Sequence, residues 1–281
     1  MPTEVHPSGN AAVYHDLLTK VPAVTLGFWI IKILATTLGE TAGDTVSMTW
    51  KHLYIPIWTR MFGQAPNITV DNLGYVVGTL LFASLLVALV IAQIKARRFH
   101  PFLYWGTIVA STTAGTTLAD FADRSLGVGY PGGSLLLLTC VLLSLFAWHR
   151  TLGSVNVETV AEPRSEAFYW VTITFSQTLG TALGDWVADS GPGYGGAALL
   201  FGALLAILAA LYFRTRVNHV LLFWAAFILT RPLGAAVGDF LDKPIDKGGL
   251  NFSRPLASLV IGVVIVALIL LIPQRAGRRA H

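Results

Sequence analysis

Long apolar blocks separated by short polar segments run along the whole chain of 281 residues. The runs 73–94, 199–213 and 256–273 contain no Asp, Glu, Lys or Arg, and a helix that crosses a bilayer needs about 20 predominantly apolar residues. The pattern predicts an all-α membrane protein with eight transmembrane helices. Their approximate limits are 24–47, 71–94, 101–122, 132–148, 167–188, 195–213, 219–241 and 255–272.

The first helix of each successive pair repeats one pattern. A Trp is followed 15 residues later by an Asp at Trp29/Asp44, Trp105/Asp120, Trp170/Asp185 and Trp224/Asp239. Between them lie the small-residue pairs Gly39/Gly43, Gly115/Ala119, Gly180/Gly184 and Gly234/Gly238. Small residues four apart allow two helix backbones to approach closely, so the four first helices are predicted to pack together around one axis.

These copies define the expected domain organisation. Residues 1–281 form a single membrane domain with repeats at about 21–98, 99–150, 165–216 and 217–275, after a polar N-terminal segment 1–20. Two-helix units all enter the membrane from the same side, so the four repeats are predicted to be parallel. The four repeats are therefore expected to be related by pseudo-fourfold or pseudo-twofold symmetry. Segment 51–71 is a longer insert that the other repeats lack.

Composition and charge agree with a membrane location. The chain is 54% hydrophobic and 12% charged, about half the charge of an ordinary soluble domain. Its single cysteine, Cys140, excludes a disulfide within the chain and a cysteine-cluster metal site. Eleven Lys and Arg lie in the terminal and inter-repeat segments, against six in the loops inside repeats. This bias predicts a multi-pass protein of the bacterial inner membrane with both termini cytoplasmic, and it explains the basic pI without nucleic acid.

A polar stripe ends in acids on one face of each repeated helix. Positions −7, −4, 0 and +3 from the repeated Asp share a face at 100° per residue. The candidate metal ligands on or beside this face are Glu40, Asp44, Asp120, Asp123, Asp185, Asp189, Asp239 and Asp242. Acids at membrane depth are costly, so a bound cation, a proton or a base is expected to compensate them. Oxygen ligands without Cys or His favour Mg²⁺, Mn²⁺, Ca²⁺, Na⁺ or H⁺.

Further residues have predicted supporting roles. Lys32 and Arg231 are intramembrane bases expected to set the charge balance. Thr37, Thr113 and Thr178 are candidate neutral oxygen ligands, and Trp29, Trp105, Trp170 and Trp224 are candidate anchors at the membrane interface. A structural alternative is that the aspartates cap the following loops or mark the membrane boundary.

The repeated unit runs from an aromatic–Trp pair to a Thr-x-Gly-x-x-x-Gly-Asp segment, as at 28–29 and 37–44. In four copies over nearly the whole chain, it resembles a family of bacterial integral membrane proteins described as a repeat of unknown function, or uncharacterised membrane-anchored protein. The resemblance implies the four-repeat architecture and no activity. Segment 40–45, Glu-Thr-Ala-Gly-Asp-Thr, is also similar to the Glu-x-Gly-Asp-(Lys/Arg)-(Thr/Ser) motif of manganese/calcium–proton exchangers. It has one more residue between Glu and Gly and lacks the base.

The leading hypothesis is a secondary transporter or exporter of a small cation, with Mn²⁺ as the first candidate and protons exchanged for it. A divalent cation would then be substrate, with no permanently bound cofactor and no enzyme activity. Expected partners are the lipid bilayer and the cation, without nucleic acid; a homo-oligomer is left open. Two alternatives stay open: a transporter of an organic cation or small solute, and a non-transporting membrane scaffold or sensor. A membrane enzyme is disfavoured because no HExxH, P-loop or catalytic triad pattern occurs at a suitable place.

Overall fold

The computed structural model describes residues 18–63 and 70–278, which fold almost entirely into helices. The α-helices of this part are α2 (Leu26–Asp44), α3 (Lys51–Phe62), α4 (Val70–Lys95), α5 (Pro101–Asp120), α6 (Tyr130–Leu152), α7 (Pro163–Asp189), α8 (Gly193–Arg214), α9 (His219–Asp242) and α10 (Arg254–Leu271). Short helical turns lie at Thr45–Thr49, Phe121–Ser125, Val157–Thr159 and Ile245–Lys247. Strands β1 (Leu18–Pro22) and β2 (Ala276–Arg278) pair antiparallel.

The predicted all-helical class is confirmed, and each of the eight predicted blocks contains one helix. Local signals set several of the helix starts: Thr25 caps α2 by accepting from the Phe28 amide at 3.3 Å, and Pro101 occupies the first turn of α5. Three elements were not predicted. Helix α3 occupies the insert of the first repeat, and the β1–β2 pair joins segments with no local strand signal. Of the predicted polar segment 1–20, residues 1–17 lie outside the described residues.

Helices α2, α5, α7 and α9, here called the inner ring, are the first helices of the four repeats. Helix α2 contacts α5 and α9, and α7 contacts the same two helices. Each contact is made at a glycine: an added Cβ would overlap the next helix at Gly39 with Thr112, Gly115 with Gln177, Gly180 with Arg231 and Gly234 with Thr36. One turn further on, Gly43 meets Thr116, Gly184 meets Ala235 and Gly238 meets Glu40. Because residue numbers increase in the same direction on both helices of each such pair, these neighbouring ring helices are parallel.

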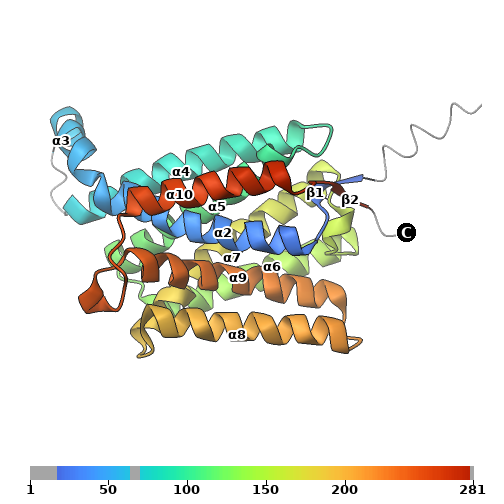
Figure 1. Cartoon of the computed structure of the whole chain (residues 1–281). Coiled ribbons are helices and arrows are strands. Elements are labelled where there is room, and N and C mark those ends of the chain that lie inside the picture. The colour runs from blue at the N-terminus through green and yellow to red at the C-terminus, as the bar shows by residue number, and fades with distance from the viewer. Residues whose placement is uncertain (1–17, 64–69, 279–281) are drawn as a thin grey trace, which may run out of the picture.

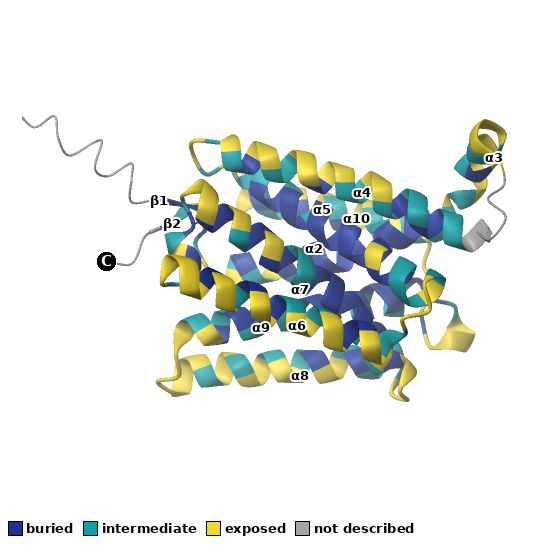
Figure 2. Ribbon diagram, turned by 180° about the vertical axis from the view of Figure 1, so that it is seen from behind, coloured by how far each residue is buried: buried dark blue, intermediate teal, exposed yellow. Residues whose placement is uncertain are grey.

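Helices α4, α6, α8 and α10, here called the outer helices, surround the ring (Figure 1). Each one packs most extensively against the inner helix of the following repeat, α4 on α5, α6 on α7 and α8 on α9, and α10 returns to α2. The repeats therefore interlock, and the last repeat closes on the first. Buried residues dominate α5 and α7, whereas exposed residues cover much of α8 (Figure 2).

Five of the described helices are long and apolar enough to cross a membrane: 72–95, 130–152, 193–214, 219–242 and 254–271. They comprise the four outer helices and α9. The other three ring helices carry polar or charged residues along their length, and the rest of the protein covers them. The structure thus supports an integral membrane protein by five candidate spans, rather than the eight that were predicted.

The two ends of the ring differ in chemistry. The repeated aspartates lie at one end, here called the acid end, where α3 projects from the bundle (Figure 1). At the opposite end, Trp105, Trp170 and Trp224 are buried in an aromatic layer and Trp29 is half-buried. The indole nitrogens of Trp105 and Trp224 donate to protein acceptors, Gln274 and the Val155 carbonyl, rather than facing outward. These tryptophans pack the bundle interior.

The glycine contacts predict opposite effects for two Gly→Ala substitutions. We expect Gly39→Ala to destabilise the protein by about 1–3 kcal/mol, because the new methyl group would overlap Thr112. Gly106→Ala, on α5, has no atom within 4 Å of the added Cβ and should stabilise by about 0.5–1 kcal/mol through helix propensity. Thermal unfolding of the purified protein in detergent measures both. Equal behaviour of the two variants would contradict the contact role of Gly39.

Candidate functional site

The acid end buries a group of carboxyl groups at the C-terminal ends of the ring helices. Six are buried there: Glu40, Asp44, Asp120, Asp185, Asp239 and Asp242. The C-terminus of a helix carries partial negative charge, and burial removes water from the carboxylates. Their convergence therefore requires compensation by a base, a proton or a cation.

Three bases from the turns and from the start of α10 lie among these acids, and each bridges two carboxylates. Lys243 Nζ lies 2.8 Å from oxygens of both Asp44 and Asp239. Arg254 Nε lies 3.5 Å from Asp44 and 3.4 Å from Asp242. In the other half of the ring, Arg124 Nε lies 2.8 Å from Asp120 Oδ1, and Arg124 Nη2 lies 3.4 Å from Asp185 Oδ2.

These bridges divide the site into two halves. Lys243 joins the first and fourth repeats, and Arg124 joins the second and third. Within the described residues, no base bridges the carboxylates of the first and second repeats, or of the third and fourth. The charge pattern is therefore twofold, although glycine contacts run around all four ring helices.

One turn deeper, the fully buried Arg231 lies among all four ring helices. Its Nη1 is 3.0 Å from Glu40 Oε2. Its Nη2 donates to the hydroxyls of Thr116 and Thr181, each at 2.5 Å. Arg231 was predicted to balance charge, and its guanidinium group contacts a carboxylate and two hydroxyls of the other three ring helices.

The most compact group of acids joins α2 and α9. Asp44, Asp239 and Asp242 place one carboxylate oxygen each within 4.8 Å of one another. Asp44 Oδ1 and Asp242 Oδ1 are buried, and no described protein group donates a hydrogen bond to them. Two oxygens of this group thus have unused acceptor capacity, which a small cation or a protonated ligand can fill. We call Asp44, Asp239 and Asp242 the carboxylate triad.

The remaining predicted site residues lie outside this triad. Asp123 is half-buried beside Gly133, and Asp189 is exposed. Lys32 is fully buried with its ammonium 4.0 Å from the centre of the Phe227 ring and no hydrogen-bond partner among the described residues. Lys32 precedes Glu40 on α2 by about two helical turns, and it forms no ion pair with the acids among the described residues.

The predicted threonine oxygens bond within their own helices. Thr37, Thr113 and Thr178 each donate to the carbonyl four residues earlier, at 3.0, 2.8 and 3.0 Å. The structure brings Thr116 and Thr181 to the charged groups instead. Both stand on the predicted polar face, one turn before the repeated Asp, and this register is the signal that identifies them.

From the sequence, Arg124, Lys243 and Arg254 were assigned only to loops. For two of them a local signal exists: Arg124 and Lys243 each follow a repeated Asp by four residues, the spacing of an ion pair on a helix. Arg254 begins α10, and nothing near it in the sequence points to Asp44 or Asp242. Its role depends on how α10 packs against α2.

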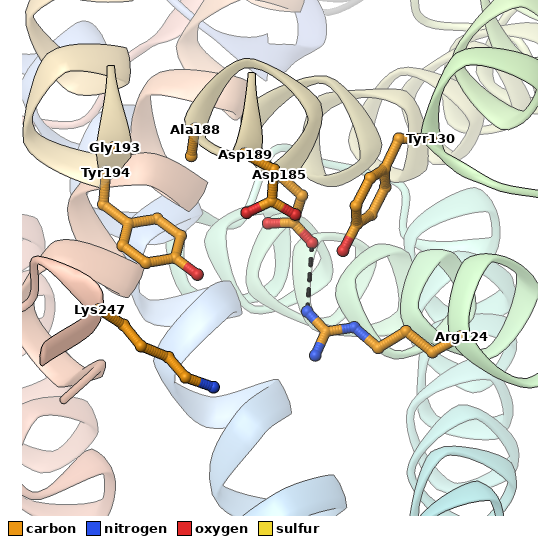
Figure 3. Close-up of a pocket in the computed structure, with 8 residues that line it drawn as sticks. All are labelled: Arg124, Tyr130, Asp185, Ala188, Asp189, Gly193, Tyr194 and Lys247. Atoms are coloured by element: carbon orange, nitrogen blue, oxygen red, sulfur yellow. Dashed lines mark hydrogen bonds and ion pairs between the residues drawn. The ribbon is translucent and has the colours of Figure 1, made fainter. Parts of the chain in front are cut away.

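A pocket of about 490 Å³ opens beside the second half of the site (Figure 3). It lies among the turn after α5, the starts of α6 and α8, the end of α7 and the turn after α9. Its lining residues are Arg124, Tyr130, Asp185, Ala188, Asp189, Gly193, Tyr194 and Lys247. Two predicted acids therefore face a cavity.

The buried ion pair in the ring centre yields a stability prediction. We expect Arg231→Met to destabilise the protein by about 3–5 kcal/mol, because the buried Glu40 carboxyl would lose the partner of its ion pair. The double variant Arg231→Met, Glu40→Gln should recover part of this loss. Denaturation of the single and double variants in detergent measures the coupling, and additive losses would contradict it.

Comparison with known proteins identifies a family. The sequence model of the family described as Repeat of Unknown Function (DUF347) matches residues 27–99, 103–154, 168–218 and 222–274. The four matches span most of the chain and confirm the predicted four repeats. Neither the curated proteins nor the solved structures contain a match.

Proposed function

The chain belongs to this family of four-repeat proteins, and we propose that it is a secondary transporter of a small divalent cation, with Mn²⁺ as the first candidate substrate. The carboxylate triad carries the proposal. Three carboxylates within 4.8 Å, two of them with an unpartnered buried oxygen, offer the hard oxygen ligands that such cations prefer. Placing them inside a bundle with apolar outer helices is otherwise unfavourable.

The transporter architecture we propose has eight spans. Helices α2 and α4–α10 cross the bacterial inner membrane as four parallel pairs with pseudo-fourfold packing, and both termini are cytoplasmic. Three observations support this arrangement: the outer helices cover the polar ring helices, β1 and β2 lie at the same end of the bundle, and bases are enriched in the segments at that end. A ring helix covered by protein does not need an apolar surface.

Cation binding and base pairing compete for the same oxygens. Burial lowers the pKa of Lys243, but the carboxylates of Asp239 and Asp44 outweigh it and raise the pKa well above its usual range. Lys243 therefore stays protonated, and it leaves the triad by moving rather than by losing its proton. In the proposed cycle a cation replaces the Lys243 ammonium, and protons replace the cation when it is released, so that the buried charge is compensated throughout.

The same ion pairs favour a second candidate, a non-transporting membrane scaffold. Every buried carboxylate of the acid end contacts a base in this structure, so the acids and bases are able to stabilise the bundle without any cation. The two functions differ in one observable property: only the transporter moves ions across a membrane.

Uptake into proteoliposomes separates the two candidates. We expect Asp44→Asn and Asp239→Asn each to reduce Mn²⁺ uptake by more than about tenfold, since even residues that only support metal ligands affect binding by 10–100-fold. Asp246→Asn, an exposed acid in the turn after α9, is the matched control and should retain uptake. Unchanged uptake in the Asp44 and Asp239 variants, or none in the unmodified protein, would exclude the proposal.

Removal of the competing base gives an independent check. Lys243→Met should bind Mn²⁺ about tenfold more tightly, a change of about 1.4 kcal/mol, while the metal-free protein becomes less stable because two carboxylates lose their shared partner. The shift of the unfolding temperature with Mn²⁺ concentration measures both quantities. A less stable variant whose unfolding temperature does not respond to Mn²⁺ would support the scaffold.

A further inference from the structure

The pocket beside Asp185 has features that the carboxylate triad does not explain. It is open to solvent, yet Asp185 beside it is only 5% exposed and belongs to the buried acids of the ring. Figure 3 shows the side chains of Asp185, Asp189, Tyr130 and Tyr194 directed toward the same space. This cavity therefore brings solvent to the edge of the acid group.

We propose that this pocket is the water-filled mouth through which a hydrated divalent cation reaches the carboxylates of the ring. The inference rests on the proposed transport function and adds to it a location for access. Apart from Lys247 of the fourth repeat, its lining residues belong to the second and third repeats, whereas the triad belongs to the first and fourth.

Oxygen atoms of suitable chemistry line the mouth. Asp185 and Asp189 are one helical turn apart on α7, so their carboxylates face the same side. The hydroxyls of Tyr130 and Tyr194 point into the pocket (Figure 3). The oxygens of these groups can accept hydrogen bonds from the water molecules around an ion, or can replace such a water as a ligand.

The size of the pocket suits a hydrated ion. A divalent cation with six water molecules needs roughly 200 Å³, taking about 30 Å³ for each water. The pocket volume of about 490 Å³ accommodates this complex with several further waters. A hydrated ion therefore has room to enter before protein oxygens replace its water ligands. This matters most for an ion such as Mg²⁺, which loses its water ligands reluctantly.

Arg124 connects the mouth to the ring. Its Nη2 lies 3.4 Å from Asp185 Oδ2 in the pocket, and its Nε lies 2.8 Å from Asp120 Oδ1. The longer contact is the one on the pocket side. A cation that binds at Asp185 displaces this contact while the shorter one to Asp120 holds the guanidinium group, which links arrival in the mouth to the buried acids.

Lys247 offers a probe position at the mouth that is not part of the carboxylate group. It is exposed and lines the pocket, whereas Ile245, two residues earlier in the same turn, is 75% exposed and does not line it. The test uses the full chain with Cys140→Ser, which removes the single native cysteine, and adds either Lys247→Cys or Ile245→Cys as the matched control.

Both variants are labelled in detergent with a bulky cationic methanethiosulfonate, checked by mass spectrometry and reconstituted for Mn²⁺ uptake. We expect labelling of the Lys247→Cys variant to lower uptake about tenfold through the added bulk at the mouth, since the cationic label restores the charge of the native lysine. Labelling of the Ile245→Cys variant should leave uptake unchanged. Mn²⁺ should slow the labelling of Lys247→Cys and leave that of Ile245→Cys unaffected.

The outcomes separate the two proposals. Uptake that stays unchanged after complete labelling of the Lys247→Cys variant, or falls equally after labelling of the Ile245→Cys variant, overturns the mouth and leaves transport standing. No uptake by the unlabelled Cys140→Ser protein, with none by the unmodified chain, overturns transport and the mouth together.

Discussion

Each helix of the inner ring places a glycine against the next helix, and the other features of the site depend on this close approach. Without a Cβ at Gly39 or Gly180, the neighbouring helix comes near enough to bring its polar face to the centre. The repeated aspartates then converge because all four copies hold them at the same distance from the glycines. Small-residue contacts of this kind are a general means of helix association where water is absent.

The convergence of the buried carboxylates brings negative charges close together, and the bases that offset this charge are distributed unequally among the four repeats. Arg231 and Glu40 occupy the centre as a single pair, where other repeats have threonine, glutamine or alanine at the corresponding places. At the acid end, Lys243 and Arg124 each hold two aspartates together across a boundary between repeats. Backbone packing therefore follows the repeats four times, while the charges pair the repeats two by two. This difference is what gives the first and fourth repeats a compact carboxylate triad.

A base shared by two carboxylates can stabilise the folded protein and still leave carboxylate oxygens available to bind a cation. A base that bridges two carboxylates leaves oxygens unused, as at Asp44 Oδ1, and a cation needs such oxygens for binding. The base remains charged, so its movement away from the acids exposes negative charge that must be met at once by another positive species. In the proposed transporter that species is the cation or protons, and the scaffold alternative differs in that the bases never leave.

The sequence by itself determined the eight helices of the four repeats and the shared register of the repeated aspartates, but not helix α3. Hydrophobic blocks, the helical period and the constant Trp-to-Asp spacing are local properties of the chain, and local properties suffice to place Asp44, Asp120, Asp185 and Asp239 at one register. Tertiary structure alone decided which bases meet these acids, which tryptophans are buried, and where solvent reaches the ring. Arg254 contacts Asp44 because the last outer helix closes on the first ring helix, and such a contact has no counterpart in sequence spacing. Charge pairing between distant segments depends on the distances between helices, and the periodicity of a single helix gives no information about those distances.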